Sequence, residues 1–212
     1  MAVTDRDSRF WDRVARKYAA RTIADLAGYE RTLEATRRYL RPEHVVFEFG
    51  CGTGTTALRL APSAARFMAT DLSGEMIVLA REKAQAEACR NVEFAVASLE
   101  AAQWPDESFD VALGFNVLHL IKDRPAAIAG VRRLLKPGGV FISKTPCIGE
   151  MNPLIRLAIP LLQAIGKAPY LDFVSGAQLE RVIAEAGFDI VERARHGSKR
   201  KDTRAFLVVR KA

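Results

Sequence analysis

The chain has 212 residues, of which 49% are hydrophobic and 27% are charged, and its formal net charge is +7. This composition is typical of one globular domain with a buried core, and it excludes a low-complexity chain. The three cysteines lack metal or redox spacing, the N-terminus lacks an apolar leader, and no apolar run reaches transmembrane length. We therefore expect a cytoplasmic protein with no transmembrane segment and no metal site.

Two helices are predicted over residues 8–40, before the first strand. The first helix places four residues on one face, namely Trp11, Val14, Ala15 and Tyr18. Such a face normally anchors a helix to the core of the protein.

An apolar run over residues 45–49 predicts a buried strand that carries Glu48. The turn that follows alternates glycines with small side chains: Gly50, Cys51, Gly52, Thr53 and Gly54. Glycine lets the backbone approach a ligand closely, and the start of a helix offers free N–H groups and a positive dipole end. The turn therefore predicts a site for the anionic or polar end of a nucleotide-like cofactor. We interpret Cys51 as a small side chain that fits this turn rather than as a nucleophile.

The spacing of this turn counts against a nicotinamide dinucleotide. The dinucleotide fingerprint G-x-G-x-x-G needs glycine at position 55, where Thr55 stands, and the pattern here is E-x-G-x-G-x-G. A second strand is predicted over residues 66–70 and ends at Asp71. An acidic residue about 20 residues beyond the glycine turn is placed to accept hydrogen bonds from ribose hydroxyls.

Strands and helices alternate along the rest of the chain, which predicts a doubly wound parallel sheet. Further strands are predicted at 92–96, 109–114, 139–144, 188–194 and 204–210, and helices near 74–89, 125–136 and 175–186. The last helix begins with a capping box, Ser175 and Gln178, and Gly187 ends it. The last two strands are joined by a loop too short for a parallel crossover, so we expect them to be antiparallel.

With these segments the chain resembles the class I S-adenosylmethionine (SAM)-dependent methyltransferases, of the methyltransferase type 11 or ubiquinone–menaquinone-biosynthesis-like group. The resemblance rests on the glycine turn and on four further segments: Phe10-Trp-Asp-Arg-Val-Ala-Arg-Lys-Tyr18, Asp71-Leu-Ser-Gly-Glu-Met-Ile, Phe109-Asp-Val-Ala-Leu-Gly-Phe-Asn-Val-Leu-His and Leu134-Leu-Lys-Pro-Gly-Gly. It runs from about residue 10 to the end of the chain. It implies a Rossmann-like, seven-stranded, mostly parallel sheet whose last strand lies antiparallel beside the fifth.

The resemblance also implies SAM as cofactor and S-adenosylhomocysteine as product. The implied cofactor residues are Tyr18, Glu48, Gly50, Cys51, Gly52, Thr53, Gly54, Asp71, Leu72, Met76, Ser98, Leu99 and Phe115. The N-terminal segment would cover the cofactor, with Tyr18 facing it. One departure is Ser98, where the family usually carries aspartate before the residue that corresponds to Leu99; we expect backbone groups or Leu99 to take part of its role.

Two residues after the fourth strand are candidates for the methyl-transfer step. His119 is the candidate general base because its unperturbed pKa lies near neutrality, and it matches the first histidine of the family's L-H-H pattern. We favour a structural role for His119, because no acidic residue near it in sequence would orient its ring. Asn116 either lines the methyl-transfer site or satisfies the backbone of its own loop. Lys144 ends the fifth strand, where it faces substrate or caps the strand.

Two C-terminal features bear on the substrate. An apolar insertion over residues 147–172 contains Pro153, suited to a helix start, and Pro160, which we expect to kink or split that helix. Residues 193–212 hold eight Lys or Arg and one acid, so the rest of the chain is balanced in charge. Lys199, Arg200 and Lys201 lie in the loop before the last strand, where they would steer an acidic or membrane-surface substrate, although an ordinary solvated loop is the interpretation we favour.

The sequence thus predicts one methyltransferase domain over residues 1–212. It comprises an N-terminal helical lid (1–41), a cofactor-binding core (42–146), a cap insertion (147–173), and a C-terminal helix with a strand hairpin (174–212). We expect methyl transfer to a small, partly apolar molecule. Phospholipid or RNA methylation and a non-catalytic SAM-binding role are the alternatives, and nucleic acid is disfavoured because the basic segment lacks interleaved aromatic residues.

Overall fold

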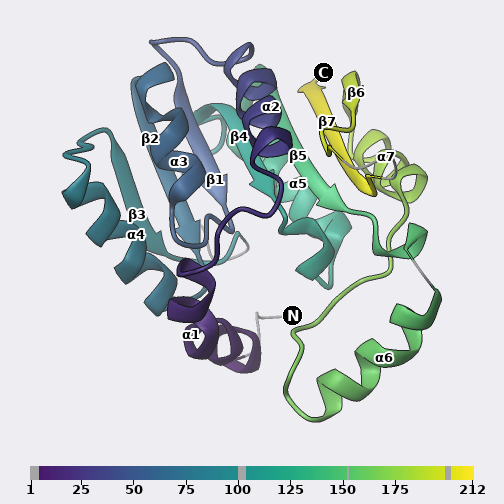
Figure 1. Cartoon of the computed structure of the whole chain (residues 1–212). Helices are drawn as coiled ribbons and strands as arrows, with labels where there is room; N and C mark the ends of the chain where they lie inside the picture. The colour runs from purple at the N-terminus through teal and green to yellow at the C-terminus, as the bar shows by residue number, and fades with distance from the viewer. Residues whose placement is uncertain (1–4, 100–103, 152, 199–201) are drawn as a thin grey trace.

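The computed structural model describes residues 5–99, 104–151, 153–198 and 202–212 (Figure 1). Its strands are β1 Val45–Phe49, β2 Arg66–Asp71, β3 Val92–Val96, β4 Phe109–Phe115, β5 Leu135–Pro146, β6 Phe188–Ala194 and β7 Arg204–Lys211. Its α-helices are α1 Asp5–Ala19, α2 Leu26–Arg37, α3 Thr55–Leu60, α4 Gly74–Ala86, α5 Arg124–Leu134, α6 Pro153–Ala164 and α7 Gly176–Glu185. Short 3-10 helices are η1 Ala61–Ser63, η2 Leu118–Leu120 and η3 Ile148–Glu150.

The strands form one seven-stranded sheet in the order β3-β2-β1-β4-β5-β7-β6. The pairs among β1 to β5 are parallel, whereas β7 lies antiparallel between β5 and β6. The expected fold class, with its last strand antiparallel beside the fifth, is therefore confirmed. Because β7 is antiparallel to both of its neighbours, β6 runs parallel to β5 and its carboxyl end lies at the same edge of the sheet.

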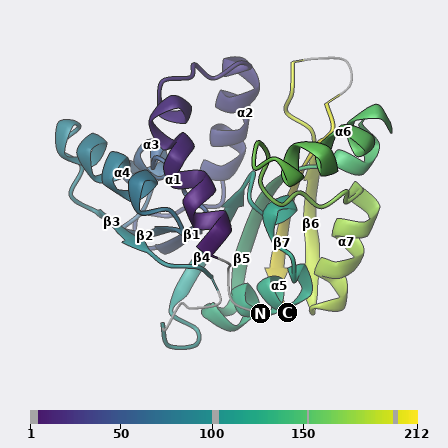
Figure 2. The ribbon, with the colours of Figure 1, turned by 90° about the horizontal axis from the view of Figure 1, so that it is seen from below.

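Helices cover both faces of this sheet (Figure 2). Phe47 and Phe141 belong to the core on the side of α5 and α7, whereas Phe67 and Phe206 belong to the core on the side of α2, α3 and α4. All four rings are completely buried. Burial of each contributes ~1.5–3 kcal/mol, so these rings fix which face of each strand points to which layer.

The strand register brings the ends of several strands to one edge of the sheet. Phe49 of β1 lies beside Thr70 of β2, and Phe115 of β4 lies beside Lys144 of β5. The order of the strands reverses between β1 and β4, which pair side by side. In open α/β sheets this reversal leaves a crevice at the carboxyl ends of the strands.

Some element boundaries differ from the sequence prediction. β5 begins at Leu135 rather than 139, because Leu135 already pairs with Phe109 before the register shift. It ends at Pro146 rather than at Lys144, because Thr145 and Pro146 still pair with β7. α4 ends at Ala86 rather than 89. α6 runs through Pro160 and is not split there. The capping box of α7 is confirmed, and Gly187 follows that helix with φ +82°.

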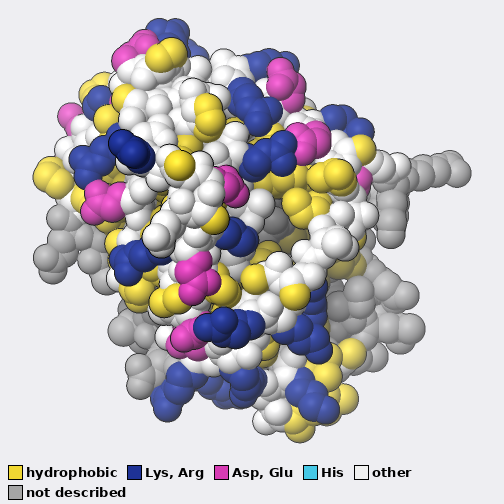
Figure 3. Space-filling model, turned by 60° about the vertical axis from the view of Figure 1, so that its left-hand side comes forward, with side chains coloured by type: hydrophobic (Ala, Val, Ile, Leu, Met, Phe, Trp, Pro, Cys, Tyr) yellow, Lys and Arg dark blue, Asp and Glu magenta, His cyan; other side chains and the backbone are white. Residues whose placement is uncertain are grey.

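Many charged side chains on the surface form ion pairs. The face of the molecule in Figure 3 intersperses Lys and Arg with Asp and Glu. Examples are the ion pairs of Arg59 with Glu30 at 2.8 Å and of Arg66 with Glu93 at 2.6 Å. Each such exposed pair contributes about 0–1 kcal/mol. None of the described helices is long and apolar enough to cross a membrane.

Candidate active site

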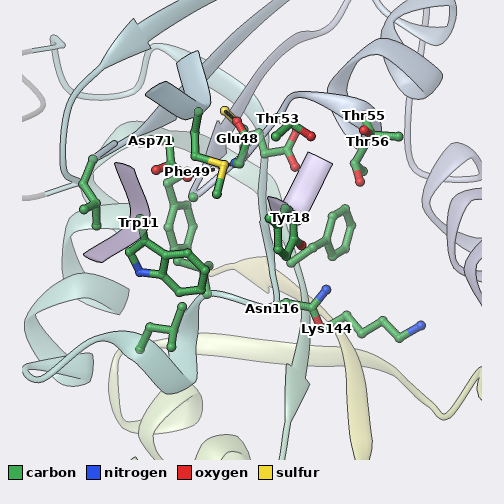
Figure 4. Close-up of a pocket in the computed structure, with 18 of the residues that line it drawn as sticks. Trp11, Tyr18, Glu48, Phe49, Thr53, Thr55, Thr56, Asp71, Asn116 and Lys144 are labelled. Carbon is green, nitrogen blue, oxygen red and sulfur yellow. Dashed lines mark hydrogen bonds between the residues drawn. The ribbon is translucent and has the colours of Figure 1, made fainter. Parts of the chain in front are cut away.

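A cavity of about 780 Å³ opens at the carboxyl edge of the sheet. Its lining comes mainly from α1, α2, the ends of β1, β2, β4 and β5, and the segment that follows α6. The helices α3 and α4 and the strand β7 contribute further residues. Figure 4 shows side chains from these elements around it, among them Trp11, Tyr18, Glu48, Asp71 and Lys144. This is the crevice where open α/β sheets bind their ligands.

The glycine turn after β1 forms one wall, and its three glycines have different tasks. All three have positive φ, between +54° and +74°. A Cβ on Gly50 would lie 2.4 Å from Val117, whereas a Cβ on Gly52 would meet no protein atom within 4 Å. Gly52 therefore presents bare backbone to the cavity, where a ligand can approach it closely.

Gly54 has a different environment from the other two glycines. Its Cβ would lie 2.7 Å from Phe94 and 2.9 Å from Ala80, and it is not among the residues that line the cavity. The structure therefore assigns Gly54 to the packing of the turn against β3 and α4. Lys83 of α4 fixes the same turn by donating hydrogen bonds to Thr53 Oγ1 at 2.7 Å and Thr55 Oγ1 at 3.0 Å.

Asp71, at the end of β2, joins two turns that face the cavity. Its Oδ2 accepts a hydrogen bond from the Gly52 N–H, and its Oδ1 accepts one from the Ser73 N–H, both at 2.9 Å. Burial raises the pKa of this carboxyl, and the backbone N–H donors oppose that rise. Each carboxylate oxygen has two lone pairs, so Asp71 keeps capacity for hydroxyl donors of a ligand.

Glu48 is a buried carboxyl at the base of the cavity. Only 2% of the residue is exposed, and its Oε2 has no hydrogen-bond partner among the described residues. Burial, and secondarily the negative charge of Asp71, raise the pKa of Glu48 to about 8. A buried acceptor without a donor is costly, so this oxygen fits the cationic or N–H group of a ligand.

Apolar and aromatic side chains form the outer wall, and α1 is held over it. The apolar lining includes Trp11, Leu72, Met76, Leu99, Phe115, Val117 and Ile121. Trp11 contacts Tyr18 edge to face, with ring centroids 6.4 Å apart. Asp12 Oδ1 accepts hydrogen bonds from Ser73 Oγ at 2.6 Å and from the Glu75 N–H at 3.2 Å. These bonds fix α1 to the start of α4.

Most of the residues that the sequence singled out meet in this cavity. Those that line it are Tyr18, Glu48, Gly50, Cys51, Gly52, Thr53, Asp71, Leu72, Met76, Ser98, Leu99, Phe115 and Asn116. Gly54 and His119 do not line it. Burial raises the pKa of the Cys51 thiol well above its usual value, which agrees with a packing role in the turn.

His119 lies in η2, behind the wall of the cavity. It is buried, and its Nδ1 has no hydrogen-bond partner among the described residues. Burial, followed by the charge of Arg124, lowers the pKa of His119 to about 4. Its carbonyl accepts a hydrogen bond from the Asp172 N–H at 2.8 Å, which ties the chain after α6 to η2. This geometry supports a structural role and gives the ring no contact with the cavity.

Further residues line the cavity although no motif indicated them, among them Thr32, Lys83, Tyr170 and Arg204. Thr32 and Arg204 come from α2 and β7, which are far apart in the sequence. No local pattern could have placed them together. Lys144 was recognisable from its position at a strand end, and the structure places its side chain in the cavity (Figure 4).

The basic loop is described only in part, because Lys199, Arg200 and Lys201 lie outside the described residues. Its first part rests on α2. The His196 carbonyl accepts hydrogen bonds from Arg31 at 2.7 and 3.0 Å, and Ser198 donates to Asp25 from its N–H and its hydroxyl. Because Asp25 lines the cavity, this part of the loop lies beside the cavity.

Comparisons with known proteins agree with this geometry. A family model described as a methyltransferase domain matches residues 46–139. The uncharacterized methyltransferase YcgJ of Bacillus subtilis is 34% identical over 127 residues, which cover 57% of this chain and 50% of that protein. Phosphoethanolamine N-methyltransferase 1 of Arabidopsis thaliana is 34% identical over 59% of this chain and 26% of its own length. The ubiquinone biosynthesis O-methyltransferase of Xanthomonas euvesicatoria is 32% identical, with coverages of 68% and 62%.

The fold also matches a solved structure. The crystal structure of YcgJ superposes with a TM-score of 0.67 at 24% identity and covers 78% of this chain and 72% of that one. This likeness shows the fold. The chain spans about half the length of YcgJ and about a quarter of the length of the Arabidopsis relative.

Proposed function

Because the chain belongs to the class I SAM-dependent methyltransferase family, whose cofactor is SAM, we propose that it transfers a methyl group to a small, partly apolar molecule by in-line displacement. The observation that carries this proposal is the convergence of Glu48, Gly52 and Asp71 on one cavity at the carboxyl edge of the sheet.

These residues fit the cofactor. The partnerless Oε2 of Glu48 suits the ammonium group of an amino acid, and the bare backbone of Gly52 leaves room for a ligand against the turn. Asp71 has lone pairs left for ribose hydroxyls, and the apolar side chains of Leu72, Met76 and Leu99 suit a flat purine ring. Ser98 also lines the cavity, in the position where the family usually has an aspartate.

SAM, when bound, supplies a methyl group on a positively charged sulfur. The protein's task is to hold the acceptor in line with that group and to exclude water, for which positioning supplies up to ~7–11 kcal/mol. Trp11 and Tyr18, on a helix tied down by Asp12, cover the apolar wall and serve the exclusion of water. A base is needed only for an acceptor that arrives protonated. Asn116 lines the cavity and is the residue that we place beside the acceptor.

A small acceptor is supported by the largely apolar outer wall of the cavity, to which α1 and the chain after α6 contribute. The relatives named for phosphoethanolamine and for ubiquinone biosynthesis also suggest a small acceptor for this chain. We further propose a cytoplasmic location and one catalytic domain over residues 1–212. Phospholipid or RNA acceptors, recruited through Lys199, Arg200 and Lys201, and a non-catalytic SAM-binding role are the alternatives that the experiment separates.

The test has a binding stage and a transfer stage. S-adenosylhomocysteine should raise the melting temperature of the protein, whereas NAD should not, and Asp71→Ala should abolish the shift. Asp110→Ala is the matched control, because Asp110 holds the Val45 N–H and Lys136 at the opposite edge of the sheet. Absence of binding by the wild-type protein would refute the proposal.

In the transfer stage, labelled methyl from SAM is offered to a cell extract that is then separated into small-molecule, lipid, RNA and protein fractions. We expect label in the small-molecule fraction, with the Asp71→Ala protein as the blank. Label in the lipid or RNA fraction would refute a small acceptor. Binding without any transfer would favour the non-catalytic role.

A further inference from the structure

The end of the cavity opposite the glycine turn contains a buried lysine that the cofactor does not explain. Lys144 is the last residue of β5 that pairs with β4, where it lies beside Phe115, and the residue is 6% exposed. Its Nζ makes one hydrogen bond within the described part of the chain, to Thr32 Oγ1 at 2.6 Å. An ammonium group has three N–H donors, so two donors of Lys144 remain for the cavity that it lines.

Thr32 does not neutralise this ammonium group. The Thr32 hydroxyl donates its own proton to the Gly28 carbonyl at 2.8 Å, so its oxygen acts as acceptor toward its other neighbours. These neighbours are Lys144 Nζ and, at 3.2 Å, His196 Nδ1. It follows that His196 carries a proton on Nδ1 and offers Lys144 no acceptor there.

The nearby carboxylates are engaged elsewhere. Asp25 accepts hydrogen bonds from the Gly28 N–H, from the Ser198 N–H and from the Ser198 hydroxyl. Asp202 accepts from the Gly197 N–H and from the backbone and side chain of Arg204, and Arg204 also lies 3.6 Å from Asp25.

The charges around this end of the cavity therefore do not cancel. Within the described part of the chain, the charges that act on Lys144 are those of Arg31 and Arg204, which are positive, and Asp25 and Asp202, which are negative. Together with Lys144 itself, these residues leave one positive charge in excess. Arg31 donates to the His196 carbonyl and Ser198, and Arg204 has both acids beside it. The uncompensated charge is thus that of Lys144. A buried charge without a partner is costly, and it is normally retained where a ligand supplies the opposite charge.

Asn116 lies next to Lys144 at the end of β4. Its backbone N–H donates to the Lys144 carbonyl at 2.7 Å, and its φ is +54°, a conformation uncommon for residues other than glycine. Figure 4 shows the Asn116 and Lys144 side chains side by side in the cavity. The Asn116 side chain is exposed there, and its amide adds two N–H donors to those of Lys144.

We propose that Lys144 and Asn116 form a subsite for an anionic group of the methyl acceptor, a carboxylate or a phosphate. This inference rests on the proposed function and narrows its substrate class to small molecules that combine an apolar body with an anionic group. The apolar wall of the cavity would hold the body of the molecule.

The state of the free lysine agrees with this assignment. Burial, followed by the charge of Arg204, lowers the pKa of Lys144 to about 8. An anion bound at Nζ would raise that pKa again, because an opposite charge favours the ammonium form. Anion binding should therefore weaken as the pH rises above the pKa of the free lysine, with Arg31, Arg204, Asp25, Asp202 and His196 as its charged or titratable neighbours.

The test uses protein saturated with S-adenosylhomocysteine and measures binding by calorimetry. The probes are benzoate, its neutral isostere benzamide, and inorganic phosphate, so the carboxylate and phosphate sources are distinguished. Wild-type protein should bind at least one anion, and if it binds benzoate it should prefer benzoate to benzamide. Lys144→Met should weaken anion binding by at least ~tenfold, and Lys144→Arg, which keeps the charge, should retain part of it.

Lys136→Met is the matched control, because Lys136 lies on the same strand at the opposite edge of the sheet, paired with Asp110. It should bind the anions as the wild type does. The inference is overturned if neither anion binds the loaded wild-type protein, if benzoate and benzamide bind equally, or if Lys144→Met leaves anion binding unchanged. If Lys144→Met does not fold, the inference is judged by whether the wild-type protein binds benzoate more tightly than benzamide. S-adenosylhomocysteine binding by these proteins is measured separately, so failure of the proposed function is distinguished from failure of the subsite.

Discussion

The buried carboxyl of Glu48 makes stability and cofactor binding depend on pH in opposite directions. Its pKa is raised from 4.5 to about 8 in the folded protein, mainly by burial. The folded state therefore holds a proton that the unfolded state releases. The resulting stabilisation is complete below pH 4.5 and is lost as the pH rises through about 8.

The size of this effect follows from the shift. Each pKa unit corresponds to ~1.36 kcal/mol, so the rise from 4.5 to about 8 gives an upper limit of ~5 kcal/mol. Glu48 lies against a cavity that water can enter, so we expect ~2–5 kcal/mol. Glu48→Gln keeps the shape of the neutral acid and does not titrate, so this loss should be absent in the variant.

The assay is urea unfolding of the ligand-free wild type and Glu48→Gln over this pH range. The difference between the two free energies of unfolding should shift in favour of the variant as the pH rises, while contributions from other titrating groups largely cancel. A difference that does not change with pH would refute the argument that burial holds Glu48 protonated.

The same group should link binding to proton release. A ligand with an ammonium group needs the carboxylate form, so the affinity for S-adenosylhomocysteine should rise about tenfold per pH unit below the pKa of Glu48. Calorimetry in two buffers of different ionisation enthalpy should detect the released proton. Glu48→Gln should bind more weakly and release none. Equal heats in both buffers for the wild type would contradict the role assigned to Glu48.

Three further predictions follow from the same contacts. Gly54→Ala should destabilise the fold by ~2 kcal/mol or more, because its Cβ would lie 2.7 Å from Phe94. Gly52→Ala should lower the stability by only ~1 kcal/mol, but it should weaken S-adenosylhomocysteine binding at least ~tenfold. The pKa of His119 is lowered from 6.5 to about 4, so the free energy of unfolding should fall by up to ~3 kcal/mol as the pH falls between these values. His119→Leu should remove this acid sensitivity without weakening S-adenosylhomocysteine binding, and weakened binding would contradict its structural role. Asp12→Ala should raise the dissociation constant of S-adenosylhomocysteine about fivefold by freeing α1, and an unchanged value would show that α1 does not cover the ligand.

The sequence predicted the kind of sheet and the residues on the cofactor side of the cavity, because both depend on short-range patterns. Alternating strand and helix segments predicted a parallel α/β sheet, and the short β6–β7 connection predicted that these two strands are antiparallel. That β7 lies beside β5 was implied by the resemblance to the methyltransferases. Glu48, Gly50, Gly52 and Asp71 stand at strand ends, and parallel strands bring their carboxyl ends to one edge.

Only the tertiary structure decided which glycine faces a ligand and which faces the core. Gly52 and Gly54 both have positive φ and lie two residues apart in the same motif, yet a Cβ on one would meet open space and a Cβ on the other would meet Phe94. For His119 the sequence left a base and a structural role open and favoured the structural one, and in the structure His119 is buried in η2 and does not line the cavity.

The substrate end of the cavity also depended on tertiary structure, because its residues come from distant parts of the chain. Thr32, Lys144 and Arg204 lie on α2, β5 and β7, and the insertion of β7 beside β5 brings them together. The sequence showed a lysine at a strand end. The charges that surround it, and their failure to cancel, arise only when the helix, the strands and the basic loop pack against one another.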